Sequence, residues 1–172
     1  VTLPAATDLS SIVSLNINRG SITIPDGMNL ASLDSVTRGA SGSLVLGNNT
    51  LTLSTLEVLG GVLTSSADIT VTGSFTFDGG TLDGAGTLTT GAGVTTLLAA
   101  TRATTLARDW INLGTVNWTG LDGLDDLIIN SGASFTNQGT FNIQTVDSNQ
   151  DIRTADSGLF VNQGTIEKLT AF

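Results

Sequence analysis

A motif toward the C-terminus recurs with a 25-residue period, and this repeat limits the possible folds more than any other feature. Residues 110–118, 135–143 and 160–168 each read aromatic-x-Asn-x-Gly-Thr-apolar-polar. The same 25-residue interval separates Gly114 from Gly139 and Gly139 from Gly164. Positions held in phase over two periods indicate a repeat architecture, in which each repeat packs on its neighbours.

Shorter and looser copies of the pattern precede the 25-residue repeat. Gly20, Gly42, Gly61 and Gly80 each begin a stretch in which apolar side chains alternate with small ones, and the intervals between them are 22, 19 and 19. A 25-residue interval from Gly61 to Gly86 leaves a second register open. The alternation has the period of a strand with one buried face, so the whole chain is predicted to be built of short strands.

A repeat of about 19–25 residues made of two or three short strands suits one coil of a parallel β-helix. We therefore predict an all-β fold of this class, a single-stranded parallel β-solenoid with seven or eight coils. The alternative is an antiparallel sandwich or barrel, which also has short alternating strands and polar turns. That alternative explains the alternation but not the fixed period of the Asn and Gly residues.

The 25-residue motif also predicts the role of each of its positions in the stack. Val116 and Trp118 are expected to point inward beneath Phe141 and Ile143 of the next coil, while the Thr and Asn residues between them face solvent. The motif glycines are expected at an equivalent corner, where positive φ or close backbone approach is needed. A ladder of side-chain amides is expected along the same edge. Its members are Asn112, Asn137 and Asn162.

The composition excludes several classes of function. The 172 residues include no Cys, no His and no Tyr, which excludes a disulfide framework, a thiolate zinc site and imidazole-dependent catalysis. The formal net charge is −9 and the six basic residues are scattered, so we expect no nucleic-acid partner. The apolar runs are much shorter than the roughly 20 residues that span a bilayer, so we expect no membrane insertion.

Three segments resemble the degenerate repeats of very large bacterial surface proteins. They are residues 79–89, 114–120 and 135–141, which order their Gly, Thr, Asn and apolar positions as the β-solenoids of autotransporter passengers and filamentous-haemagglutinin-like adhesins do. The resemblance is clearest over residues 69–168. It implies a right-handed β-helix, an extracellular location at the bacterial cell surface, and a structural or adhesive role as a shaft or scaffold. Such shafts often carry no catalytic residues, so we expect no enzyme activity.

We expect one β-solenoid domain over residues 1–172. It divides into irregular N-terminal coils over 1–60, middle coils over 61–109 and regular 25-residue coils over 110–172. Because residue 1 is Val rather than Met, we expect a processed protein or a piece of a longer one. Neither end of the sequence resembles a polar cap, so the open strand edges are expected to meet flanking solenoid repeats or identical subunits, and the second case would form a filament.

The densest acidic group in the sequence comprises Asp122, Asp125 and Asp126. Carboxylate oxygens are the ligands that Ca²⁺ prefers, so we predict a candidate calcium site here and no other cofactor. The alternative is a solvated turn whose charges aid solubility, since the spacing is not that of an EF-hand loop.

Carboxylate pairs such as Asp147 with Asp151 would suit a general acid and base. Nothing places two carboxylates in phase on neighbouring coils, so we predict no catalytic residue.

Two further patterns bear on the choice of partner. No Thr-x-Thr pair recurs at a fixed period, so the outward threonines are interpreted as residues of solvated strand faces. Trp110 and Trp118 are expected in the core rather than on a sugar-binding platform, because Trp118 is in phase with Ile143. A host or matrix glycan or protein is the remaining candidate partner. The alternative functions are a carbohydrate-binding module and a fragment of a polysaccharide-active β-helix enzyme.

Overall fold

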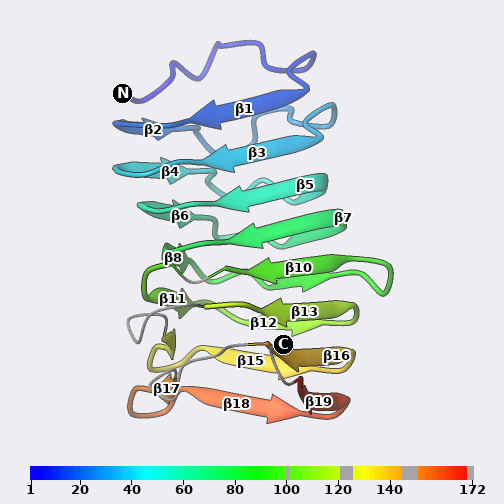
Figure 1. The fold of residues 1–172 in the computed structure, drawn as a ribbon. Coiled ribbons are helices and arrows are strands. Elements are labelled where there is room, and N and C mark those ends of the chain that lie inside the picture. Colours follow the sequence, from blue (N-terminus) through cyan, green and yellow to red (C-terminus); the bar gives the residue numbers. More distant parts are fainter. Residues whose placement is uncertain (100, 121–125, 145–150, 170–172) are drawn as a thin grey trace.

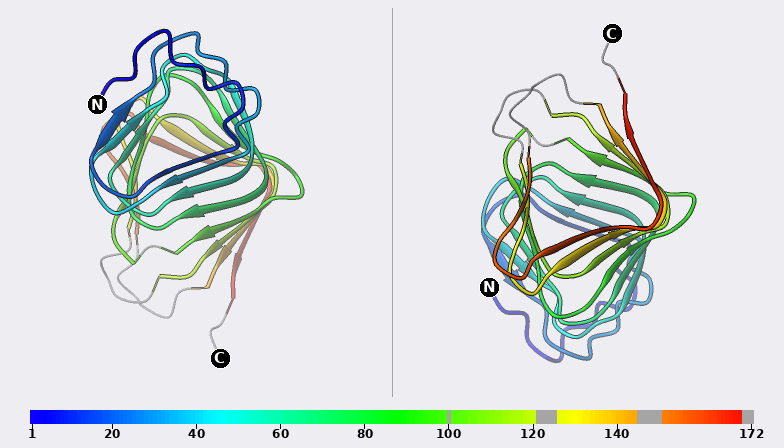
Figure 2. Two further views of the ribbon diagram at one scale, coloured as in Figure 1. Left: turned by 90° about the horizontal axis from the view of Figure 1, so that it is seen from above. Right: turned by 90° about the horizontal axis from the view of Figure 1, so that it is seen from below.

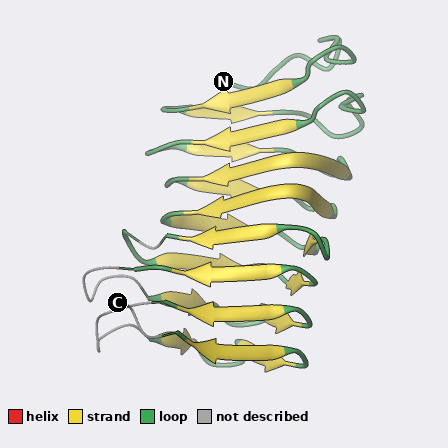
Figure 3. Ribbon diagram, turned by 45° about the vertical axis from the view of Figure 1, so that its right-hand side comes forward, coloured by secondary structure: helices red, strands yellow, loops and turns green. Residues whose placement is uncertain are grey.

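The structure, a computed structural model, describes residues 1–99, 101–120, 126–144 and 151–169. These residues form 19 strands and no helix (Figures 1 and 3). Strands pair in parallel with the strands one coil before and one coil after, and the chain makes about seven turns. The prediction of an all-β parallel solenoid is therefore confirmed. A helix long and apolar enough to cross a membrane does not occur among the described residues.

From β5 on, each coil contributes a strand to each of three stacks, which we call sides 1, 2 and 3 in chain order; the first coil, from β2 to β3, has strands only on sides 1 and 3. Side 1 is a seven-stranded sheet of β2 (Ser21–Thr23), β4 (Ser43–Val45), β6 (Val62–Thr64), β8 (Gly80–Asp83), β11 (Thr104–Ala107), β14 (Leu127–Ile129) and β17 (Ile152–Thr154). Side 2 contains the first parts of β5 (Leu51–Val58) and β7 (Ile69–Phe77), then β9 (Leu88–Thr90), β12 (Trp110–Asn112), β15 (Ser134–Asn137) and β18 (Leu159–Asn162). Side 3 contains β1 (Ser14–Ile17), β3 (Ser35–Arg38), the second parts of β5 and β7, then β10 (Thr95–Leu98), β13 (Thr115–Trp118), β16 (Thr140–Ile143) and β19 (Thr165–Lys168).

The strand register defines the length of each coil. On side 3 the pairing of Thr55 with Ser74 closes a 19-residue coil, whereas that of Thr115 with Thr140 closes a 25-residue coil. On side 1, Ser21 pairs with Ser43, Ser43 with Val62, and Val62 with Thr81. The glycines at 20, 42, 61 and 80 precede these partners, so their predicted equivalence is confirmed and the 25-residue register from Gly61 to Gly86 is wrong.

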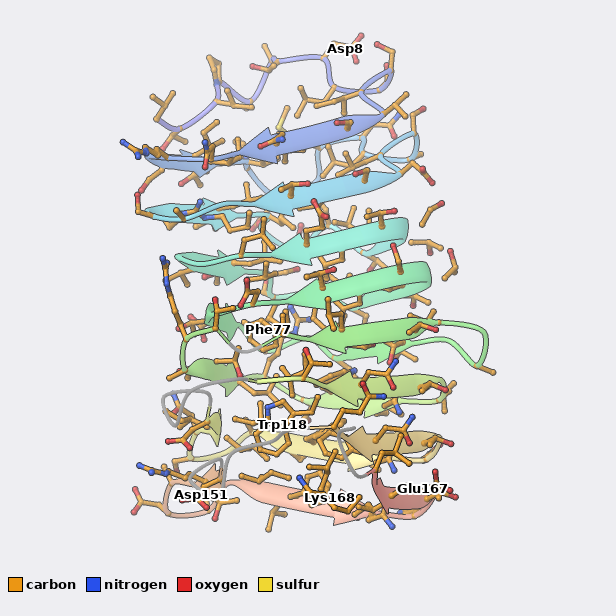
Figure 4. The ribbon with its side chains drawn as sticks, in the orientation of Figure 1. Asp8, Phe77, Trp118, Asp151, Glu167 and Lys168 are labelled. Carbon is orange, nitrogen blue, oxygen red and sulfur yellow. The ribbon has the colours of Figure 1, made fainter. Side chains whose placement is uncertain are left out.

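Seen along the axis, the strands enclose an interior (Figure 2). The core is a set of apolar columns along this interior. On side 1 a column of leucines crosses four successive coils, namely Leu44, Leu63, Leu82 and Leu106, and all four side chains are buried. Side 2 carries an aromatic column in its last coils, where the ring of Trp110 stacks on that of Phe135 with centroids 4.3 Å apart. Because similar residues stack on one another in successive coils, the interior is continuous. Phe77 and Trp118 are part of this interior (Figure 4).

The positions of the 25-residue motif lie as expected. Val116 pairs with Phe141 and Trp118 with Ile143, and all but the half-buried Ile143 are buried. The motif glycines need close approach and not positive φ: a Cβ added at Gly139 would overlap the carbonyl oxygen of Gly114 one coil earlier. Only a residue without a Cβ lets the two backbones approach so closely at this corner.

Candidate functional site

Of the predicted calcium residues, Asp126 directly precedes β14 on side 1. Asp122 and Asp125 fall outside the described residues, so only Asp126 can be placed. Its Oδ2 is 3.0 Å from Nε of Arg153, and its Oδ1 accepts the backbone N–H of Asp151 at 3.0 Å. Among the described residues, no group of three or more acidic, His or Cys side chains could hold a metal ion. Calcium binding stays a prediction, and Ca²⁺ at Asp126 would compete with a bound guanidinium.

Several other aspartates connect successive coils. Oδ1 of Asp68 accepts the backbone N–H of Thr87 at 2.8 Å, and Oδ1 of Asp109 accepts that of Ser134 at 2.9 Å. The same contact, from an aspartate to a backbone N–H of the next coil, is made by Asp26, Asp78 and Asp126. Ionised acceptors strengthen such hydrogen bonds. Part of the negative charge of the chain therefore lies on side chains with a structural contact.

The amide ladder predicted from the motif is confirmed, and it lies inside the solenoid. Nδ2 of Asn112 donates to Oδ1 of Asn137 at 2.8 Å, and Nδ2 of Asn137 donates to Oδ1 of Asn162 at 2.7 Å. The hydroxyl of Thr90 donates to Oδ1 of Asn112 at 2.9 Å and so begins the ladder. Each Nδ2 also donates to the carbonyl of the glycine two residues further on. Asn112 and Asn137 are fully buried, and their polar atoms are satisfied by these contacts.

Trp110 and Trp118 are 0% and 2% exposed, so the prediction that they pack in the core is confirmed. Nε1 of Trp110 donates to Oγ1 of Thr90 at 3.2 Å, which ties the indole to the start of the amide ladder. Neither indole face is open to solvent. Sugar binding by this chain would therefore depend on other side chains.

A column of small hydroxyl side chains runs along the outside of side 3. Its members are Ser14, Ser35, Thr55, Ser74, Thr95, Thr115, Thr140 and Thr165. Successive members are separated by coils of different length, so no single period finds them in the sequence. The next outward column is mixed and includes Glu57, Leu97 and Glu167, so the side as a whole is not a uniform threonine array.

Two arginines lie in the interior, although arginine is usually exposed. Nη1 of Arg38 donates to the carbonyl of Ile17 at 2.8 Å, and Nη2 of Arg108 donates to the carbonyl of Ala67 at 3.0 Å. Burial lowers the pKa of both guanidinium groups. The pKa of Arg108 falls to about 10, although nearby carboxylates oppose this shift. Both contacts join one coil to an earlier one, which indicates a role in the scaffold.

The two ends of the solenoid expose their interiors to different extents. At the N-terminal end, the backbone N–H of Leu3 donates to the carbonyl of Thr23, and the inward residues Leu9 and Leu15 are half-buried. At the C-terminal end, Ile166 is 43% exposed although Phe141, the preceding member of its inward column, is fully buried. The last coil, on which Glu167 and Lys168 are labelled, lies at the opposite end of the solenoid from β1 (Figure 4).

No family model, no curated protein and no solved structure matches this chain. Its class therefore follows from the fold alone, which is a parallel β-solenoid of about seven turns. The similarity to autotransporter and haemagglutinin-like adhesins is a resemblance of repeat pattern.

Proposed function

We propose that this protein is a non-catalytic structural segment of an extracellular bacterial surface protein. It forms a stiff rod, presents sides lined with Ser, Thr and Asn, and joins other β-structure at its ends. The resemblance of its repeats to those of surface adhesins supports the location and the adhesive use of the sides. The fold supports the rod, because parallel strand pairing joins each coil to its neighbours on two sides at the N-terminal end and on all three sides from β5 on.

The observation that carries the proposal concerns the last coil of the solenoid. Its strands β17, β18 and β19 each pair with one described strand, on the side of the preceding coil. The inward column ends there on Ile166, whose side chain is well exposed. An unpaired edge over an apolar column is a template for further strands. We therefore place the junction with flanking repeats or identical subunits at this end and at its N-terminal counterpart.

Resistance to bending follows from contacts that cross between coils. Backbone ladders on three sides, the aspartate contacts and the amide ladder all run along the axis. The interior is filled by large side chains, such as Trp110 and Phe135, and a close-packed interior has low compressibility. A rod of this kind transmits force along its length without a catalytic site.

Sedimentation velocity over a wide concentration range, with negative-stain imaging of the same samples, tests the proposal. Polymers one solenoid wide would identify copies of this chain as the partner at the ends, and a strict monomer would leave flanking repeats as the partner. Polymers that grow through the sides would contradict a rod that joins other β-structure at its ends. A panel of uncharged glycans tests the absence of catalysis, because product release that is abolished by one Asp→Asn change would overturn it.

Adhesive use of the sides is tested separately. Saturable binding of a matrix glycan or protein, weakened when hydroxyl residues of side 3 such as Thr95 and Thr115 are changed to Val, would support it. Because both tryptophans are buried, such binding would use hydroxyl and amide groups. Equal binding by the altered and the unaltered protein would show that side 3 is not the adhesive surface.

A further inference from the structure

We propose that the C-terminal end of the solenoid is a docking surface for one kind of partner, a further coil of the 25-residue type that carries Asn at the ladder position. The coil binds in parallel register with β17, β18 and β19. This inference rests on the proposed function, in which the ends meet other β-structure. It goes further by naming which structure the C-terminal end accepts.

The backbone edge at this end is complete on all three sides. β17 pairs with β14, β18 with β15 and β19 with β16, and no described strand lies beyond them. A docking coil therefore finds three edges at the same level, in the geometry that every earlier coil has used. A partner with one strand would satisfy only one of them.

The side chains at this end continue the interior of the preceding coils. The ring of Phe160 packs against those of Phe135 and Phe141, with centroids 5.3 Å and 5.8 Å away, and it is only half-buried. Phe135 and Phe141, one coil earlier, are fully buried because the last coil covers them. An aromatic residue and an apolar residue at the same register positions would bury Phe160 and Ile166 in the same way.

The amide ladder makes the surface specific. Nδ2 of Asn112 donates to Gly114 and also to Asn137, so it uses both of its N–H groups. Nδ2 of Asn162 donates to the carbonyl of Gly164 at 2.9 Å and to no further acceptor among the residues that the structure describes. Asn162 is exposed at this end, where water can accept its second N–H. Once a further coil covers it, that N–H needs a protein acceptor, which an Asn in the same register supplies.

The N-terminal end of a second copy does not meet this requirement. In the earlier coils the ladder position holds Leu53 and Val71, and the ladder begins only at Thr90. The residues that face the N-terminal end from inside, including Leu9, Ile12 and Leu15, are apolar. Docked on the C-terminal end, they would cover the N–H of Asn162 without accepting it. A buried donor without an acceptor disfavours that complex.

The test extends the full chain by a copy of residues 145–169 inserted after Leu169. One matched control carries the same extension with the copied ladder asparagine changed to Leu. A second control carries instead a copy of residues 60–78, a 19-residue coil of the shorter type that begins at the same corner and holds Val71 at the ladder position. Hydrogen exchange is measured for the backbone amides of β18, β19 and the extension. Trp fluorescence shows that the original coils remain folded.

We expect the first extension to be protected and to slow exchange in β18 and β19 about tenfold or more, and both controls to protect them less. Unprotected amides in the first extension would overturn the proposal. Equal protection by all three extensions would also overturn it, because the edge would then accept any strand. Head-to-tail polymers of the unextended chain would overturn it as well, although they would leave the proposed rod intact. Association of the unextended chain through its sides, or catalytic behaviour, would instead contradict the proposed function.

Discussion

The coils before β9 and the coils after β11 share one architecture but differ in their connections and in their interior. In the earlier coils the corner from side 3 to side 1 is short and passes through glycines in the left-handed region, such as Gly61 with φ of +61° and Gly80 with φ of +83°. In the last coils the flanking strands are further apart in the sequence, since β13 ends at Trp118 and β14 begins at Leu127, and β16 ends at Ile143 and β17 begins at Ile152. The interior also changes, because Leu53 and Val71 are replaced in register by Thr90 and then by asparagine.

This difference shows which parts of a coil set its length and its register. The 25-residue coils have the longest connections from side 3 to side 1, because eight residues separate β13 from β14 and β16 from β17, against two to four in the coils up to β8. The register depends on the interior, and here the two regions are not equivalent. Apolar columns pack with any neighbour of suitable volume, whereas an amide must meet an amide at a fixed position. We therefore expect single substitutions to cost more in the C-terminal coils.

The largest effect is expected for Gly139→Ala. The new Cβ would overlap the carbonyl oxygen of Gly114, which is backbone and cannot rotate away, so we expect a loss of about 3 kcal/mol in the free energy of unfolding. Gly93→Ala is the matched control, because no atom lies within 4 Å of a Cβ at that position. Urea denaturation followed by Trp fluorescence measures both. Equal stabilities would show that the close approach at Gly139 is not required.

Asn137→Leu comes next, with an expected loss of about 2 kcal/mol. It removes the middle of the ladder and leaves the buried Nδ2 of Asn112 without its acceptor. Replacing Asn112, Asn137 and Asn162 together is expected to cost less than the sum of the single changes, because no unpaired amide remains. Gln138→Ala is the control, since that exposed amide pairs with Gln163 outside the core at 3.1 Å. A strictly additive triple variant would contradict a coupled ladder.

The buried side chain of Arg108 lies near the junction of the two regions, and it leads us to expect that the free energy of unfolding depends on pH. Burial lowers its pKa to about 10 in the native state, below the ordinary value that the side chain regains on unfolding, so above about pH 10 the native state loses its proton first. The free energy of unfolding should therefore rise as the pH increases through 10, by on the order of 1 kcal/mol at pH 11. The chain has no Tyr, His or Cys to obscure this range. In Arg108→Met the rise should be smaller, and an unchanged rise would show that another group causes it.

The smallest effect is expected for Asp126→Asn, which breaks the ion pair with Arg153. The Arg153 side chain is 59% exposed, so we expect a loss of about 0.5 kcal/mol. The same variant tests the calcium prediction. If Ca²⁺ binds, added CaCl₂ should raise the denaturation midpoint of the unaltered protein more than that of the variant. No shift in either protein would argue against a calcium site.

The parts of the fold that could be predicted are those in which identity and spacing repeat together. The 25-residue motif placed Val116 and Trp118 inside and the three asparagines in one ladder, and both predictions are confirmed. In the earlier coils, Gly20 to Gly80 still marked the register, although the spacing drifts. The hydroxyl column of side 3 could not be found this way, because Ser and Thr are frequent everywhere and the coil length changes along the column.

The candidate site was less accessible from the sequence. Nothing in the sequence distinguished Asp68 and Asp109, and only the structure shows that they accept backbone N–H groups of the next coil. The buried arginines gave no local signal, because nothing around Arg38 or Arg108 in the chain distinguishes them from exposed ones. Asp122 and Asp125 lie outside the described residues, so the calcium site stays a prediction.

The amide ladder has a direction. In each of its members the carbonyl faces the coil before and the N–H faces the coil after, so the small dipoles of the side chains add along the axis. The column has a carbonyl pole capped by the hydroxyl of Thr90 and an N–H pole at Asn162. The parallel strands alternate their hydrogen bonds toward both neighbours and carry no such bias between coils. Because the amide dipoles all point the same way along the axis, the two ends of the ladder differ. A rod in the reverse orientation would therefore present different hydrogen-bonding groups to a neighbouring coil.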